Sequence, residues 1–426
     1  MSYQGYLTSA VAGINAEAVW STYNNRGAGI KFCDVEYDFN SNHSDLKNIT
    51  IVGPTPVDPF ASGAGIKHGT AVLGEVVSKD DGIGTTGIAG DCDAYFSSSY
   101  IDSVWDITGA LTNAMSVLSA GDVLLIEQQM AGPNYDASNA SSQIGLVAVE
   151  WYLPWYQTIM LAVGQGITVV EAAGNGQQNF DDPIYSTDNG GHYPFLPENN
   201  SGAIIVGAGS NEKFSFSDDV PRSRLSFSNY GSRVDVQGIG QRIYTTGYGD
   251  LYAQSVDEEY TRLFGGTSSS SPMVAGATIL LQSVYKKSTG KVLTPDEVKI
   301  NLKTSGKLQV DGVYSVQDYH IGPLPDAYQA IQLALSSTGL TDLYTKQEIT
   351  VFPNPSNGIF NISLSDNSHI QEMKIINALG QEICRVSVPA RTERFLSVNL
   401  LDQPKGIYFV QLKTEEKIVT KKITFD

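Results

Sequence analysis

The feature that most constrains the fold is an alternation of short apolar segments with helical ones over residues 1–335. The apolar segments predict buried strands at Ile30–Cys33, Val123–Ile126, Ile167–Val170, Ala203–Val206 and Val234–Val236. Helical patterns occur at His68–Val77, at Asp106–Leu118, at about Ile144–Val163, from Pro272 onward, and from a capping box at Thr294 to about Lys303. This order favours an α/β fold with a doubly wound parallel sheet, covered on both faces, that binds ligands at the carboxyl ends of its strands.

The pattern changes after residue 335. Residues 336–348 have the composition of a linker, and residues 349–426 show short strand patterns separated by turns such as Pro353-Asn354-Pro355. The charge changes at the same place: residues 346–426 carry 10 basic and 9 acidic side chains, whereas residues 1–345 carry 17 and 36. We therefore expect two domains, 1–335 and 349–426, the second of which is a small all-β sandwich.

The overall charge argues against several classes of partner. The chain carries 27 basic and 45 acidic side chains, a net charge of −18, so nucleic acid and anionic lipid are not expected partners. Residues 151–170 are uncharged, but Pro154, Gly164 and Gly166 interrupt them. They predict a buried helix, a turn and a strand, and no membrane span. The residues that follow Met1 lack the basic and apolar regions of a signal peptide.

The three cysteines, Cys33, Cys92 and Cys384, are too few for a disulfide scaffold. Cys33 lies at the end of one predicted strand and Cys92 at the start of a neighbouring parallel strand. The two positions are then about 15 Å apart, beyond the roughly 7 Å that a disulfide allows between Cα atoms. We predict free thiols, with Cys33 buried and inert.

Four segments with chemically useful side chains follow apolar strands or open helices. They are Cys33-Asp34-Val35-Glu36, His68-Gly69-Thr70, Ala172-Ala173-Gly174-Asn175-Gly176 and Gly266-Thr267-Ser268-Ser269-Ser270-Ser271-Pro272. Together they supply a carboxylate, an imidazole, an amide and a hydroxyl, the set needed for nucleophilic acyl transfer. An imidazole takes the proton of a serine, a carboxylate orients the imidazole, and an amide donates to the oxyanion.

In the order Asp, His, Asn and Ser, these segments resemble the subtilisin family of serine peptidases. The resemblance implies a triad of Asp34, His68 and Ser268, with Asn175 as the oxyanion donor. It rests above all on Gly266–Pro272 followed by Met273-Val274-Ala275-Gly276. In the family a Ser-Pro pair closes the motif three residues after the nucleophile, so Pro272 selects Ser268 over Ser269.

Each of these residues also has a purely structural reading. His68 could be a core histidine of a helix, and Asn175 could be a left-handed turn residue between two glycines. Asp34 could cap a turn, and Asp38 competes with it for the role of acid. We favour Asp34 because it directly follows the apolar strand.

The chain departs from the family at the segment that pairs with the substrate backbone. The family usually has Ser-Leu-Gly there, whereas this chain has Glu127-Gln128-Gln129. An extended polypeptide substrate can still pair through backbone groups, so the resemblance implies substrate-binding roles for Gln128, Gln129 and Gly174. The glutamine side chains alter the pockets, so the family's side-chain preference does not transfer.

The acyl-transfer chemistry requires no cofactor, and we expect no catalytic metal. Structural calcium recurs in the family, and Asn179–Asp182 with Asp188-Asn189 could supply oxygen ligands. The spacing of an EF-hand is absent, so a solvated acidic loop is the favoured reading of these residues.

The C-terminal part resembles the sorting domain of proteins exported by the type IX secretion route. The match rests on Val351–Pro355, Ile376–Gln381, Gly406–Val410 and Lys421–Ile423. It implies a secreted or surface-attached protein that engages the secretion machinery through residues 349–426. A generic binding module of the same fold is the alternative.

The sequence thus predicts a secreted serine endopeptidase that acts on polypeptides through an acyl-enzyme intermediate. The alternative function is a catalytically silent, surface-displayed binding protein on the same fold.

Overall fold

The protein is described from a computed structural model that covers residues 3–9, 12–139, 141–187, 189–211, 220–312, 319–336, 349–352, 356, 358–364, 370–377, 381–387, 395–414 and 418–425. The chain divides into two compact units, Met1–Ser336 and Ser337–Asp426. Residues 337–348 of the predicted linker, the whole Pro353-Asn354-Pro355 turn and part of the 376–381 motif lie outside the described residues.

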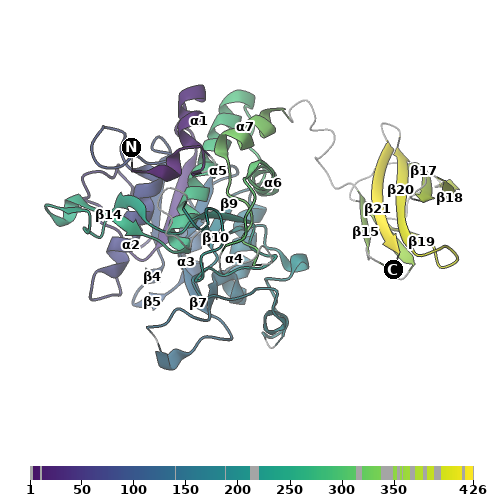
Figure 1. The fold of residues 1–426 in the computed structure, drawn as a ribbon, viewed down its shortest axis with the longest axis horizontal. Coiled ribbons are helices and arrows are strands. Elements are labelled where there is room, and N and C mark those ends of the chain that lie inside the picture. The colour runs from purple at the N-terminus through teal and green to yellow at the C-terminus, as the bar shows by residue number, and fades with distance from the viewer. Residues whose placement is uncertain are drawn as a thin grey trace. The chain divides into compact units, whose positions relative to one another are not determined.

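A seven-stranded parallel sheet forms the centre of the first unit (Figure 1). Its order is β11-β10-β9-β6-β1-β3-β2, and every neighbouring pair is parallel. The strands are β1 (Lys31–Glu36), β2 (Thr50–Ile51), β3 (Asp93–Ser98), β6 (Val123–Ile126), β9 (Thr168–Ala172), β10 (Ile204–Gly209) and β11 (Val236–Ile239). The order reverses between β1 and β6, and ligands bind beyond the carboxyl ends of the strands at such a switch point.

Helices cover both faces of this sheet. The helices of the first unit are α1 (Ala16–Tyr23), α2 (Ala64–Val77), α3 (Ile107–Met115), α4 (Leu153–Gly164), α5 (Thr267–Thr289), α6 (Pro295–Ser305) and α7 (Ala327–Ser336). One core cluster joins one face of the sheet to α1, α2, α5, α6 and α7, and another joins the opposite face to α3 and α4. The predicted doubly wound α/β fold is confirmed.

The first unit also contains short antiparallel strands outside the central sheet. They are β4 (Tyr100–Ile101) with β5 (Val104–Trp105), β7 (Gln129–Ala131) with β8 (Leu146–Ala148), and β12 (Ile243–Thr246) with β14 (Glu259–Phe264) and β13 (Tyr252–Ala253). The 3-10 helices are Gly5–Leu7, Ala137–Asn139, Val149–Trp151, Pro183–Ser186, Pro197–Asn199 and Val256–Glu258.

Local sequence signals explain several helix ends. Thr294 and Glu297 form the predicted capping box of α6, in which each side chain accepts a hydrogen bond from the other residue's backbone N–H. The predicted helix over 144–163 is wrong in its first part. Gly145 has a φ of +88°, residues 146–148 form β8, and the helix α4 begins at Leu153 with Pro154 in its first turn.

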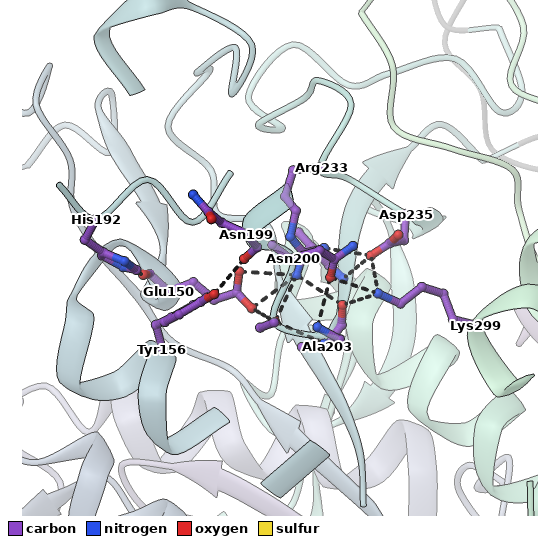
Figure 2. A network of polar contacts seen from close by, with 12 residues as sticks. Glu150, Tyr156, His192, Asn199, Asn200, Ala203, Arg233, Asp235 and Lys299 are labelled. Carbon is purple, nitrogen blue, oxygen red and sulfur yellow. Dashed lines mark hydrogen bonds and ion pairs between the residues drawn. The ribbon is translucent and has the colours of Figure 1, made fainter. Parts of the chain in front are cut away.

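A network of buried ion pairs stabilises the edge of the sheet formed by β10 and β11 (Figure 2). The Arg233 guanidinium lies 3.1 Å from Glu150 Oε1 and 2.8 Å from Asp235 Oδ2, and all three side chains are at most 5% exposed. Lys299 Nζ donates to the Ala203 carbonyl at 2.9 Å and lies 3.6 Å from Asp235 Oδ2. Burial raises the pKa of Asp235, but the cations of Arg233, Lys299 and Lys303 outweigh burial and lower it overall.

The second unit consists of two small antiparallel sheets, β15-β16-β19 and β18-β17-β20-β21. Their strands are β15 (Ile349–Phe352), β16 (Ile359–Leu364), β17 (Ile370–Asn377), β18 (Glu382–Ser387), β19 (Phe395–Asn399), β20 (Gly406–Thr414) and β21 (Ile418–Phe425). Phe360 and Val398 from one sheet share a core cluster with Ile375, Val410 and Ile423 from the other. This shared core makes the unit a β-sandwich, as predicted.

Two further expectations concern single features. Cys33, Cys92 and Cys384 are free thiols, as predicted, and burial raises the pKa of Cys33 well above its usual value. Among the residues that the structure describes, no helix has both the length and the apolar character that a membrane crossing needs.

Candidate active site

The carboxyl edge of the sheet, next to the switch point between β1 and β6, carries a cavity of about 670 Å³. His68 from α2, Asn175 from the segment after β9, and Ser268 from the start of α5 all line this cavity. The structure therefore brings together three of the four residues that the family resemblance implies. Gln128 and Gln129 line the same cavity, whereas Gly174 is buried and donates its backbone N–H to Thr267 Oγ1 at 3.2 Å.

The carboxylate that contacts the imidazole belongs to Glu36 and not to Asp34. Glu36 Oε1 lies 2.5 Å from His68 Nδ1, and Glu36 Oε2 accepts the backbone N–H of Tyr37 at 3.0 Å. The Glu36 side chain is only 1% exposed. Two oxygens with separate donors hold this carboxylate in one orientation, which in turn fixes the orientation of the imidazole ring.

The assignment of Asp34 as the carboxylate that orients His68 is wrong. Strand β1 continues to Glu36, so Asp34 lies inside the strand, where it pairs with Phe96 of β3 and Leu125 of β6. Asp34 and Glu36 share one face because side chains alternate along a strand, but Asp34 is two residues further from the carboxyl edge. Within the described structure, neither carboxylate oxygen of Asp34 has a hydrogen-bond partner.

Burial and the charge of Glu36 shift the pKa values of both Asp34 and His68. Burial, and secondarily the charge of Glu36, raises the pKa of Asp34 well above its usual value. Burial by itself lowers the pKa of His68, but the charge and hydrogen bond of Glu36 outweigh burial and raise it overall. The imidazole also packs edge-on against Phe264, with ring centroids 5.5 Å apart.

A close approach of helix α2 to the segment after β1 brings His68 to Glu36. A Cβ atom at Gly69 would lie 2.3 Å from the Asp38 carbonyl oxygen, so a residue with a side chain would push the helix away. The close approach therefore requires the glycine of His68-Gly69-Thr70. It lets the helix lie against the backbone and places the imidazole next to the strand end.

The burial of neighbouring serines separates Ser268 from the rest of the serine run. Ser269 Oγ donates to the Ile239 carbonyl at 2.8 Å, Ser270 Oγ donates to the Gly266 carbonyl at 3.3 Å, and Ser271 Oγ donates to Glu127. These three serines are fully buried, whereas Ser268 is half-buried and lines the cavity. Among the described residues no hydrogen bond joins Ser268 Oγ to His68, and such bonds often tighten only when substrate binds.

The amide of Asn175 is oriented by Thr267. The backbone N–H of Thr267 donates to Asn175 Oδ1 at 2.9 Å, and the Thr267 hydroxyl lies 3.1 Å from the same oxygen. Both donors engage the oxygen, so Asn175 Nδ2 keeps its hydrogens for a ligand in the cavity. Gly266 permits this arrangement: its φ is +96°, and a Cβ atom there would lie 3.3 Å from Asn175 Nδ2.

Sequence reasoning missed Glu36 and the supporting role of Thr267. A signal for Glu36 was present, because Val35 continues the apolar face of the strand beyond Asp34 and moves the strand end to residue 36. No local pattern pointed to Thr267. Its partners Gly174 and Asn175 lie more than 90 residues away, so only the folded chain brings them together.

The acidic loop that could supply calcium ligands is only partly described, because Asp188 lies outside the described residues. Asp181 uses both carboxylate oxygens to accept the backbone N–H of Ser232. In the described parts of the chain, no three His, Cys, Asp or Glu side chains gather as a metal cluster. The solvated acidic loop stays the favoured reading, and a calcium site there stays its untested alternative.

Comparison with known families supports the same reading of the fold. A family model described as "Subtilase family" matches residues 27–322, which is more than half of the chain. The chain belongs to the subtilase family. A second model, "Secretion system C-terminal sorting domain", matches residues 350–426 of this subtilase. The protein is thus a serine peptidase of the subtilase family with a sorting tail that marks it as secreted or attached to the cell surface.

Individual relatives show how far the similarity extends. The subtilase is 27% identical over 294 residues to Subtilisin DY of Bacillus licheniformis. The aligned region covers 68% of this chain and 88% of that protein. This chain is 26% identical over 266 residues to Subtilisin NAT of Bacillus subtilis subsp. natto, of which it spans only 57%. Among solved structures, a protease of Pseudoalteromonas arctica PAMC 21717 matches with a TM-score of 0.54 and 20% identity, over 78% of this chain and 98% of that one. This structural match shows the fold alone.

Proposed function

We propose that this subtilase hydrolyses peptide bonds with Ser268 as nucleophile, His68 as general base, Glu36 as the carboxylate that orients His68, and Asn175 as an oxyanion donor. The observation that carries the proposal is the Glu36–His68 hydrogen bond at the cavity that Ser268 and Asn175 also line. An acid, a base, a hydroxyl and a free amide donor at one cavity are the parts that acyl transfer requires.

In the acylation step, His68 Nε2 takes the proton of Ser268 Oγ while this oxygen attacks the scissile carbonyl carbon. Glu36, hydrogen-bonded to His68 Nδ1, stabilises the imidazolium that forms. Asn175 Nδ2 and the backbone N–H of Ser268 donate to the oxyanion. The Ser268 position at the start of α5 adds the positive end of the helix dipole.

The acyl-enzyme forms when the C–N bond breaks and His68 returns its proton to the leaving amine. A water molecule then attacks the ester, His68 takes a proton from it, and the acid product leaves as Ser268 regains its proton. Each step uses only groups of the chain and water, so the proposed chemistry requires no cofactor. Polypeptides bound in extended form are the proposed substrates, and the sorting domain is the proposed contact with the secretion machinery.

Fluorophosphonate labelling followed by mass spectrometry tests the nucleophile. We expect rapid labelling on the peptide that contains Ser268 and none in Ser268→Ala. We also expect kcat of Ser268→Ala to fall by on the order of 10⁶, the size known for the triad of a subtilisin itself. Ser269→Ala is the matched control, because its hydroxyl is buried against the Ile239 carbonyl, and it should label like the wild type.

The same experiment separates the peptidase from a catalytically silent binding protein. A silent protein has no activated hydroxyl and would not label. Labelling on Ser269, or a loss of activity under tenfold in Ser268→Ala, would contradict the assignment of the nucleophile.

A further inference from the structure

The proposed chemistry divides the cavity into two sides. His68 must return a proton to the leaving amine, so the leaving group lies on the His68 side of Ser268. The carbonyl oxygen points to Asn175 Nδ2, so the residue that supplies the scissile carbonyl lies on the Asn175 side. We call this residue the acyl-side residue. Its Cα is bonded to the carbonyl carbon, so its side chain begins two bonds from that carbon and must lie close to Asn175.

The walls next to Asn175 come from two neighbouring strands. Strands β6 and β9 pair in parallel, with Ile126 opposite Glu171, so the segments that follow them leave the sheet side by side. Glu127, Gln128 and Gln129 line the cavity from the first segment, and Ala172 and Asn175 line it from the second. An acyl-side side chain has to enter between these two segments.

The side chain of Gln129 occupies this entrance. Gln129 Oε1 accepts the backbone N–H of Asn175 at 2.9 Å, and Gln129 Nε2 donates to Gln143 Oε1 at 3.1 Å. A Cβ atom built on Gly174 would lie 3.4 Å from Gln129 Oε1, so the glutamine lies directly against the backbone of the second segment. The side chain thus connects the two segments and continues to Gln143, which we call the Gln129–Gln143 bridge.

A second cavity of about 500 Å³ lies next to the bridge. Gln143, Asn175 and Gly265 line both cavities, and the second cavity is lined in addition by the apolar side chains of Ile144 and Phe227 and by Ser142, Gln177 and Gly266. Space for a large side chain therefore exists near the acyl side. Gln143, at the end of the bridge, stands between that space and the catalytic cavity.

Gln128 differs from its neighbour. Gln128 Oε1 accepts the indole N–H of Trp105 at 2.8 Å, and the side chain is 5% exposed. Trp105 packs against Trp155 on the α3–α4 side of the sheet. Gln128 is therefore held toward the core, and Gln129 is the glutamine whose amide crosses the substrate entrance.

We infer that the Gln129–Gln143 bridge sets specificity by closing the acyl side of the cavity, so that this subtilase cleaves after small residues such as glycine, alanine and serine. The inference rests on the proposed function. A large acyl-side residue has to break two hydrogen bonds and displace the Gln129 amide before its carbonyl reaches Asn175. Gln129 is a specificity-determining residue in this scheme, and it takes no part in the bond-breaking steps.

The test compares internally quenched peptides that differ only in an alanine or a phenylalanine as the acyl-side residue. We expect the wild type to favour alanine by at least tenfold in kcat/KM. Gln129→Gly should raise the phenylalanine-to-alanine ratio at least tenfold, because it removes the side chain from the entrance. Gln143→Ala keeps the bond between Gln129 and Asn175 but removes the far end of the bridge, so its ratio should rise by a smaller factor of at least three.

Gln165→Gly provides the matched control, since Gln165 is exposed at the end of α4 and does not line the cavity. Its ratio should stay within twofold of the wild type. Because Gln129 also holds the backbone of Asn175, the ratio is the readout, and a uniform loss on both peptides does not affect it. Each variant is first labelled with a fluorophosphonate. If Gln129→Gly is labelled but its phenylalanine-to-alanine ratio stays within threefold of the wild type, the inference about the bridge is wrong and the proposed function is unaffected. If the wild type is not labelled, the proposed function itself is wrong.

Discussion

At the residue scale, Glu36 and Asp34 show how two carboxylates on one strand face can differ in chemistry. Glu36, at the carboxyl end of β1, has a donor on each oxygen, and one of these donors is the imidazole of His68. Asp34 lies two residues earlier, is fully buried and has no hydrogen-bond partner among the described residues. A buried carboxyl without partners favours its neutral form, so Asp34 is poorly suited to stabilise an imidazolium.

Substitution of the two carboxylates by their amides should separate their roles. Glu36→Gln keeps the size of the side chain but presents an uncharged group to His68 Nδ1, so we expect kcat to fall by on the order of 10⁴. Asp34→Asn is the matched control and should leave kcat within threefold. Steady-state kinetics on a peptide substrate check both values. Equal losses in the two variants would return Asp34 to the triad.

The pH dependence of kcat/KM gives an independent readout of the same contact. His68 must be neutral to act as a base, and Glu36 raises its pKa above the ordinary value of about 6.5. The acid limb of the wild-type profile should therefore lie above about pH 6.5. In Glu36→Gln the charge is gone, so the limb should move to lower pH, whereas in Asp34→Asn it should stay in place.

At the element scale, the interior of most elements was predictable from the sequence, but the ends of several strands were not. Strand β6 was predicted at its observed bounds, and the capping box located the start of α6. The predicted strand that became β1 stopped three residues early, and the one that became β9 stopped two residues early. Strand β1 continues through the buried polar residues Asp34 and Glu36, and β9 continues through the buried Glu171. A strand buried on both faces can therefore be longer than its run of apolar residues.

The same limitation explains the outcome at the site. His68, Asn175 and Ser268 belong to local motifs and could be found from sequence, whereas the carboxylate had to be chosen by its distance from a strand end that was misplaced. The false helical start at residue 144 has a different cause. Residues 146–148 pair as a strand with residues 129–131, and the pattern of a short sequence segment does not show which distant segment it pairs with.

The buried ion network in Figure 2 leads to a prediction at this scale. Arg233→Met removes the cation between Glu150 and Asp235 and leaves buried carboxylates without it, so we expect the first unit to lose about 3–5 kcal/mol of unfolding free energy. Lys303→Met is the matched control. Lys303 also contacts Asp235, at 3.3 Å, but its side chain is 40% exposed, so the loss should be about 0–1 kcal/mol.

Urea unfolding followed by tryptophan fluorescence checks this difference at neutral pH, and its pH dependence checks the cause. The pKa of Asp235 is lowered in the folded protein, so its contribution is present above the ordinary pKa of about 3.9 and is lost as the pH falls through the lowered value. The gap between Arg233→Met and the wild type should therefore narrow below about pH 4. A gap that is the same at all pH values would point to lost packing instead of charge.

At the scale of the whole molecule, the chain combines two units that have separate cores. The core clusters of the first unit draw on residues between Tyr6 and Ala334, and the cluster of the second unit draws on residues between Phe360 and Phe425. The proposed triad, the oxyanion donor and the Gln129–Gln143 bridge all belong to the first unit. Peptidase chemistry and export are thus assigned to different parts of the chain.

Deletion of residues 337–426 should leave the peptidase intact, because no residue of its cores or of its site is removed. We expect kcat/KM to stay within threefold and the midpoint of thermal unfolding to stay within about 2 °C. Trp20, Trp105, Trp151 and Trp155 are all the tryptophans of the chain, so their fluorescence follows the first unit in both proteins. In a host that exports the full chain, the shortened protein should be retained by the cell, since the sorting domain is missing. An inactive or aggregated remainder would mean that the sandwich supports the fold of the peptidase, and the two units would then have to be treated as one.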